Sequence, residues 1–206
     1  MPPHILIRDD ERGCRVTYAS GFLPIAEADA LLGFLLGAAP FVAEEPVVFG
    51  KAHKVTRATC AFGDVGVRYR YAGVTREAAP WPAALSEVRS QIEQSADAGF
   101  NFVLCTLYPD GKAGLGWHSD DERDLCAGAP IASLSLGEAR DFYVRRTDSR
   151  ELAARVSLAH GSLLVMSGAT QRFYQHQVPR RARCHAPRVN LTFRAMRALS
   201  GRSIGG

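Results

Sequence analysis

The sequence predicts an α+β fold that is mainly β, with a small helical layer ahead of a jelly-roll-like core. After Gly99, short runs of β-forming residues alternate with Gly, Asp and Pro turns. No segment of helix length separates those runs, which disfavours a parallel sheet with crossover helices and favours an antiparallel sandwich or barrel. Before Gly99, two segments show the apolar spacing of helices.

The two helices are expected at residues 24–37 and 82–96. The first is apolar and has Glu27 and Asp29 near its start, where negative charge suits the helix dipole. The second follows a Pro-rich break and places three apolar residues at helical spacing, Leu85, Val88 and Ile92. Strands are expected at 102–104, 131–136, 141–144, 162–166 and 188–194.

Length and composition indicate one ordinary globular domain. At roughly 150 residues per domain, 206 residues leave little room for two, and 47% hydrophobic with 22% charged residues excludes wholesale disorder and collagen-like repeats. The longest charge-free stretch near the N-terminus, 30–43, is too short to span a bilayer, and the first residues do not resemble a signal peptide. We expect no membrane association and a cytoplasmic location, or a nuclear one in a eukaryote. Five scattered cysteines without a C-x-x-C pair indicate reduced thiols.

Charge is segregated along the chain. Residues 152–206 contain nine arginines and no Asp, Glu or Lys, whereas the remainder has 16 basic residues (25 − 9) and 21 acidic ones. A cationic face of this kind suits a polyanion such as a nucleic acid. The alternative is a solvated surface in a chain that uses 22 arginines and 3 lysines, and charge alone leaves both interpretations open.

His118-Ser119-Asp120 places two possible metal ligands at positions i and i+2, which in a strand point to the same face. A third ligand must come from elsewhere, and the best candidate is His176, 56 residues beyond Asp120. Two imidazoles and one carboxylate on one side of Fe(II) form the facial triad of non-haem oxygenases. H-x-D also occurs often by chance, so the spacing alone leaves this interpretation weak.

The segment 188–194 alternates strictly. One face carries Arg188, Asn190, Thr192 and Arg194, and the other carries Val189, Leu191 and Phe193. If the polar face points into a barrel, its two arginines need protein carboxylates or an acidic ligand to offset their desolvation. An edge strand with its polar face in water is the alternative, which the local pattern favours.

Taken together, these residues closely resemble the AlkB family of Fe(II)- and 2-oxoglutarate-dependent nucleic-acid dealkylases, from about residue 21 to residue 197. The motifs that carry the resemblance are 100–104, 108–111, 118–122, 130–133, 140–142, 160–164, His176 and 188–194. Within the family the chain is similar to the duplex-DNA repair branch, because the motifs at 48–51, Arg57, 62–64 and 81–82 also match.

The resemblance implies a double-stranded β-helix (jelly-roll) core, with N-terminal helices packed on one face and a nucleotide-recognition lid. It implies a single dioxygenase domain over 1–206. Its expected parts are an N-terminal extension at 1–20, the lid at 45–75, the catalytic core at 100–197 and a tail at 198–206.

The resemblance also implies roles for the polar residues. His118, Asp120 and His176 would hold Fe(II). Arg194 would pair with the distal carboxylate of 2-oxoglutarate with the help of Tyr108, and Arg188 would lie beside the cosubstrate and the metal as a catalytic residue. Thr106 and Asn190 would complete the cosubstrate site. Thr106 stands where family members usually carry asparagine, so one amide contact to 2-oxoglutarate is replaced by a hydroxyl.

Toward nucleic acid, the resemblance makes Tyr71 an aromatic wall that sandwiches a flipped base with His118, and it places Glu122 near the base edge. Phe49, next to Gly50 in a hairpin-like turn, would be the wedge that fills the gap left by the flipped base. Arg57 and Lys51 would contact phosphates. Without the resemblance, Phe49 is a hairpin residue, Tyr71 a core residue and Glu122 part of a solvated acidic run.

The implied activity is oxidative demethylation of N-alkylated bases in DNA, such as 1-methyladenine and 3-methylcytosine, with release of formaldehyde, succinate and CO2. The expected partner is alkylated DNA, single-stranded or duplex, and the protein is expected to be a monomer. The loop after Arg146 is shorter than in duplex-specific relatives, which leaves the strand preference open. An RNA demethylase with the same site and a non-catalytic nucleic-acid-binding barrel are the alternatives.

Overall fold

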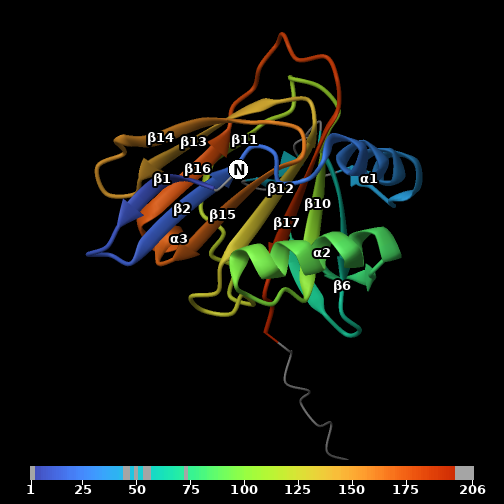
Figure 1. Cartoon of the computed structure of the whole chain (residues 1–206), viewed down its shortest axis with the longest axis horizontal. Coiled ribbons are helices and arrows are strands. Elements are labelled where there is room, and N and C mark those ends of the chain that lie inside the picture. The colour runs from blue at the N-terminus through green and yellow to red at the C-terminus, as the bar shows by residue number, and fades with distance from the viewer. Residues whose placement is uncertain (1–2, 44–46, 49–50, 53–56, 72–73, 198–206) are drawn as a thin grey trace, which may run out of the picture.

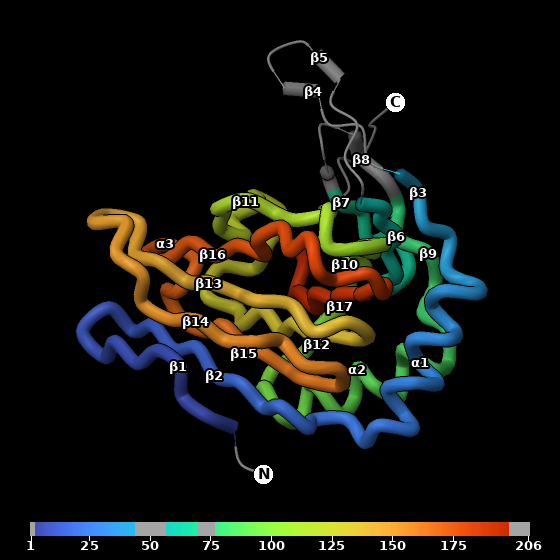
Figure 2. Tube along the Cα trace, turned by 90° about the horizontal axis from the view of Figure 1, so that it is seen from above, coloured from blue at the N-terminus to red at the C-terminus, as the bar shows by residue number. Residues whose placement is uncertain are grey.

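The computed structural model describes residues 3–43, 47–48, 51–52, 57–71 and 74–197. Two sheets face each other, and two long helices cover the far side of the larger one (Figures 1 and 2). This arrangement confirms the predicted jelly-roll core with helices on one face. No helix among the described residues has the length and apolar character needed to cross a membrane.

The larger sheet has nine strands, which alternate in direction except where β9 (Ala79–Pro80) pairs parallel with β6. Its order is β1 (His4–Asp9), β2 (Cys14–Ala19), β15 (Ser162–Gly168), β12 (Ile131–Gly137), β17 (Arg188–Arg194), β10 (Phe102–Tyr108), β6 (Ala58–Gly63) and β3 (Val42–Ala43). The smaller sheet has the order β11 (Leu115–His118), β16 (Tyr174–Val178), β13 (Arg140–Arg146) and β14 (Leu152–Leu158). Two short hairpins, β4 (Val47–Val48) with β5 (Lys51–Ala52) and β7 (Arg68–Tyr71) with β8 (Val74–Glu77), stand apart.

Both predicted helices are confirmed as α1 (Ile25–Ala38) and α2 (Ala83–Ala96), and a short third helix, α3 (Thr170–Phe173), precedes β16. The apolar spacing of α1 and α2 explains which faces they bury against the larger sheet. The resulting core contains Leu31 and Leu35 of α1, Leu85, Val88 and Ile92 of α2, and Val189, Leu191 and Phe193 of β17.

A second core fills the space between the two sheets. Phe142, Val144 and Leu158 of the smaller sheet pack there with Leu164 and Met166 of the larger sheet. Phe142 and Met166 of this core also border a cavity between the sheets, which the polar inward side chains of β17 line along the length of the strand.

The alternative of an edge position for 188–194 is wrong. β17 lies in the middle of the larger sheet, where it pairs with β10 on one side and β12 on the other. Its apolar face packs under the helices, and its polar face points into the sandwich. The four polar residues of the alternating pattern therefore line the interior. Its two arginines are removed from water there and need partners that offset the loss of hydration.

Residues 4–19, expected within an N-terminal extension, form two strands of the larger sheet, because β2 pairs with β15. Tyr18 also connects the strand to the smaller sheet: its hydroxyl donates to the Ser157 carbonyl at 2.8 Å and accepts from the Ala159 amide at 3.0 Å. β6 lies inside the range expected as a lid, yet it pairs with β10 in the core. Strands of the core therefore come from well before residue 100.

Candidate metal and cosubstrate site

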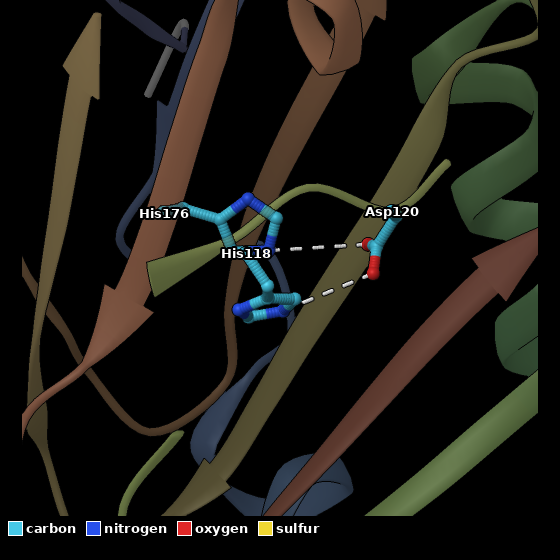
Figure 3. A group of neighbouring side chains, drawn as sticks. All are labelled: His118, Asp120 and His176. Carbon is cyan, nitrogen blue, oxygen red and sulfur yellow. Dashed lines mark ion pairs between the residues drawn. The ribbon is translucent and has the colours of Figure 1, made fainter. Parts of the chain in front are cut away.

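Three possible metal ligands converge at the open end of the sandwich (Figure 3). His118 ends β11, and its register partner on the neighbouring strand β16 is His176. Asp120 lies just beyond β11, so the turn after the strand, and not strand alternation, brings its carboxylate to the two imidazoles. The Nε2 atoms of His118 and His176 lie 3.9 and 4.0 Å from the Asp120 carboxylate oxygens, and the ligand atoms all lie within 4.8 Å of one another.

The protonation states of this group suit a divalent metal. Burial lowers the pKa of His176 to about 4, so its imidazole is neutral at pH 7 and keeps a lone pair for a metal. Burial opposes ionisation of Asp120, but Arg194 and the two histidines more than offset it and hold the pKa of Asp120 below its ordinary value. His118 donates its Nδ1–H to the Gly116 carbonyl at 2.8 Å, which leaves Nε2 as the ligand atom. Two imidazoles and one carboxylate fit Fe(II).

The three residues form one wall of a cavity of about 200 Å³ between the two sheets. Polar side chains from three strands of the larger sheet line the opposite wall. They are Thr106 and Tyr108 of β10, Ser133 of β12, and Arg188, Asn190, Thr192 and Arg194 of β17. Phe142 stacks on the His176 ring at 5.3 Å between ring centroids and closes the cavity on the smaller sheet.

Arg188 is fully buried, with 1% of its surface exposed. Its Nη2 donates to Ser135 Oγ at 2.9 Å and to Asn190 Oδ1 at 2.6 Å, and its guanidinium lies 5.1 Å from the Tyr108 ring centre. Among the described residues, its Nε and Nη1 have no hydrogen-bond partner, and no carboxylate forms an ion pair with it. Burial lowers the pKa of Arg188 to about 10, which shows that keeping this side chain charged inside the protein costs free energy of folding. Its two donors without a partner could bind an anion.

Arg194 occupies a different place from the one the sequence predicts. Its Nη2 donates to Asp120 Oδ1 at 2.9 Å, and its Nη1 lies 3.5 Å from Glu122 Oε1. The register of β17 on β10 pairs Tyr108 with Arg188 and sets Arg194 opposite Phe102, six residues away along the strand. The predicted pairing of Arg194 with Tyr108 around one carboxylate does not fit this geometry, and the partner of Tyr108 is Arg188.

The structure brings the other predicted cosubstrate residues together. Thr106 and Asn190 are register partners and both line the cavity. Asn190 accepts from Ser133 Oγ at 3.0 Å and donates to Thr192 Oγ1 at 2.9 Å, so its amide is fixed in a polar row along the wall. Ser133 and Ser135 were not predicted as site residues. Their alternation with Ala132, Leu134 and Leu136 in β12 was the signal that could have found them.

Apart from His118, two of the residues predicted to contact nucleic acid are described in full, Glu122 and Arg57. Glu122 lines the cavity and is partly exposed. Arg57 also lines it, is 7% exposed and donates to the Gly114 carbonyl at 3.2 Å, so its place is a buried wall and not the surface expected for a phosphate contact. Lys51 and Tyr71 lie in β5 and β7, but their side chains are outside the description, and Phe49 and Gly50 lie outside the described residues.

The sequence matches the model of the 2OG-Fe(II) oxygenase superfamily over residues 15–194. It is 46% identical over 154 residues to DNA oxidative demethylase ALKBH2 of Mus musculus, covering 71% of this chain and 64% of the relative. It is 44% identical to ALKBH2 of Homo sapiens (71% and 59% covered), and 35% identical to alpha-ketoglutarate-dependent dioxygenase alkB homolog 3 of Bos taurus (88% and 66% covered).

The chain thus spans about three fifths of the length of these ALKBH2 relatives. The fold is also similar to the solved structure of OsALKBH1, with a TM-score of 0.65 and 19% identity over 94% of this chain and 100% of that one, a likeness that concerns the fold alone. The chain therefore belongs to the AlkB family within the 2OG-Fe(II) oxygenase superfamily, a group of dioxygenases that use Fe(II) and 2-oxoglutarate.

Proposed function

We propose that this protein removes alkyl groups oxidatively from N-alkylated DNA bases such as 1-methyladenine and 3-methylcytosine, with release of formaldehyde, succinate and CO2. One observation carries the proposal. A single cavity contains a two-histidine, one-carboxylate group of the kind that binds Fe(II), and it also contains a buried arginine without an acidic partner among the described residues. The names of the ALKBH2 relatives, DNA oxidative demethylases, support DNA as the substrate.

His118, Asp120 and His176 would hold Fe(II). Arg188, beside Tyr108, would bind a carboxylate of 2-oxoglutarate through its two remaining donors. Bound iron and 2-oxoglutarate supply the oxidising power with O2. The chain itself keeps Asp120 ionised through Arg194, keeps His176 neutral by burial, and uses Phe142 to shield the metal side of the cavity from water.

The base would enter at the exposed edge of the cavity. The side chain of His118 is 29% exposed and that of Glu122 35%, whereas Asp120 and His176 are buried beneath them. A base alkylated at a ring nitrogen carries a positive charge, and the Glu122 carboxylate places a negative charge where such a base would arrive. The aromatic wall at Tyr71 and the wedge at Phe49 stay predictions.

The test is release of formaldehyde and succinate by the Fe(II)-loaded protein with a 3-methylcytosine oligonucleotide. The substrate is given as single-stranded DNA, duplex DNA and matched RNA, each with and without 2-oxoglutarate. Turnover of DNA that requires both iron and 2-oxoglutarate is expected, and Asp120→Ala should abolish it while the protein stays folded. Faster turnover of RNA would move the proposal to an RNA demethylase. DNA binding without any 2-oxoglutarate consumption, or residual turnover by a folded, iron-depleted Asp120→Ala protein, would contradict it.

A further inference from the structure

The segment 118–120, which carries two of the three candidate metal ligands, is connected to the segment that carries the third. The Asp120 backbone N–H donates to Gln171 Oε1 at 2.9 Å, and Ser119 Oγ donates to the Tyr174 carbonyl at 3.0 Å. Gln171 belongs to α3, and Tyr174 begins β16, the strand of His176. Two hydrogen bonds therefore connect the turn after β11 to residues 171–174, which shortly precede the third ligand.

We propose that Gln171 is a positioning residue for the metal site: through its contact with the Asp120 backbone it holds the Asp120 carboxylate in register with His118 and His176 before a metal binds. The inference deepens the proposed function and rests on it, because it concerns the same three ligands. Gln171 itself is not a ligand. Its amide oxygen contacts the backbone of Asp120, not a metal or a substrate.

Asp120 needs such support because it lies outside the strand ladder. β11 ends at His118, so no cross-strand pairing fixes the backbone of the turn beyond it. The arginine that contacts its carboxylate, Arg194, fixes the side chain from the larger sheet. Rotation of the Asp120 peptide would still carry the carboxylate away from the imidazoles. The hydrogen bond from the Asp120 N–H to Gln171 Oε1 opposes this rotation.

The side chain of Gln171 and the helix that carries it are themselves fixed by contacts with the larger sheet. Its Nε2 contacts Met166 Sδ at 3.3 Å, which points its Oε1 toward the turn. Thr170, the preceding residue, is buried, and its hydroxyl donates to the Ser167 carbonyl and accepts from the Arg15 amide at 3.2 Å. α3 is therefore anchored to β15 and β2 of the larger sheet, and through Gln171 that sheet positions a ligand whose two partners stand on the smaller sheet.

The experiment measures the affinity for Mn(II), used as a probe in place of Fe(II), by electron paramagnetic resonance without 2-oxoglutarate or substrate. Gln171→Leu keeps the volume and removes the acceptor, and it is expected to weaken Mn(II) binding about 10- to 100-fold, as loss of such outer partners does. Gln171→Glu keeps an acceptor oxygen at the same reach and should restore most of the affinity. Gln175→Leu is the matched control, because Gln175 adjoins His176 but contacts Arg145 on the other side of the sheet.

A merely structural role predicts a different pattern, which calorimetry of the metal-free variants separates. If Gln171 only stabilises the fold, Gln171→Leu lowers the melting temperature and leaves the Mn(II) affinity of the folded protein unchanged, which overturns the proposal. Equal losses of affinity in Gln171→Leu and Gln175→Leu also overturn it. If the wild type binds no Mn(II), the proposed metal site fails together with this inference, whereas tight binding by both wild type and Gln171→Leu refutes the inference alone.

Discussion

Replacing Arg188 with methionine should change stability and cosubstrate binding in opposite directions. A fall of the Arg188 pKa from its ordinary value to about 10 corresponds to a cost on the order of 3 kcal/mol, at about 1.4 kcal/mol per unit. Methionine removes this cost and fills much of the same volume. It also removes the hydrogen bonds to Ser135 and Asn190, each worth about 1 kcal/mol. The metal-free variant should therefore be as stable as the wild type or slightly more stable.

The affinity for 2-oxoglutarate should fall, because the substitution removes the guanidinium that we propose binds its carboxylate. Truncating one partner of a buried charge pair costs about 2–5 kcal/mol, which corresponds to a loss of affinity of about 30-fold or more. The wild type should also gain thermal stability from saturating 2-oxoglutarate, by the usual linkage of binding to folding. The Arg188→Met protein should gain little at the same concentration.

The assay combines scanning calorimetry of the metal-free proteins with titration calorimetry of 2-oxoglutarate into Mn(II)-loaded protein without O2. Arg194→Met is the comparison, because Arg194 has a buried carboxylate partner in Asp120. Breaking that pair should lower the stability of the metal-free protein by about 3–5 kcal/mol. If Arg188→Met is destabilised as strongly as Arg194→Met and still binds 2-oxoglutarate with wild-type affinity, Arg188 is a structural residue and the cosubstrate lies elsewhere.

Three further substitutions test separate parts of the molecule. Phe49→Ala should reduce activity on duplex far more than on single strands, and equal losses in both assays would make Phe49 structural. Gly111→Ala should lower the unfolding free energy by about 1–3 kcal/mol, because the added Cβ would overlap with the Arg181 carbonyl of the facing loop; an unchanged urea midpoint would contradict this. Tyr18→Phe should cost about 1–3 kcal/mol by removing the hydroxyl that connects β2 to the smaller sheet. An unchanged melting temperature would show that these two hydrogen bonds of the Tyr18 hydroxyl do not stabilise the fold.

Local patterns predicted the elements whose stability depends on near neighbours in the sequence. The helical spacing of Leu85, Val88 and Ile92 sufficed for α2 because all three residues pack into one core under the larger sheet. The two strands at 4–19 were missed although Cys14, Val16 and Tyr18 alternate as buried residues. Arg15 and Thr17 between them complete a strand-like alternation, and β1 pairs with β2 as a neighbouring strand, but the other partner of β2, β15, lies more than 140 residues later. The local alternation could have predicted a strand here, but its place beside β15 could not be read from the neighbouring sequence.

The candidate metal ligands were predictable from residue types, but the contacts that position them were not. His118 and Asp120 stand in a recognisable motif, and His176 was the best third candidate in the chain. Gln171 has no distinguishing chemistry in the sequence, and it matters only because α3 lies against the turn after β11. The contact between Gln171 and the Asp120 amide could therefore be identified only from the folded structure.

The sequence assigned the place beside Tyr108 to Arg194, whereas the structure gives that place to Arg188. Strand alternation correctly placed both on one face of β17, but parity cannot distinguish two positions six residues apart, which lie about 20 Å from each other along a strand. The register with β10 decides between them, since it pairs Tyr108 with Arg188 and leaves Arg194 beside the metal ligands. The two arginines therefore differ in their partners. Arg194 pairs with the Asp120 carboxylate, a candidate metal ligand, whereas Arg188 has two donors without a partner among the described residues, which is why we propose that it binds the cosubstrate anion.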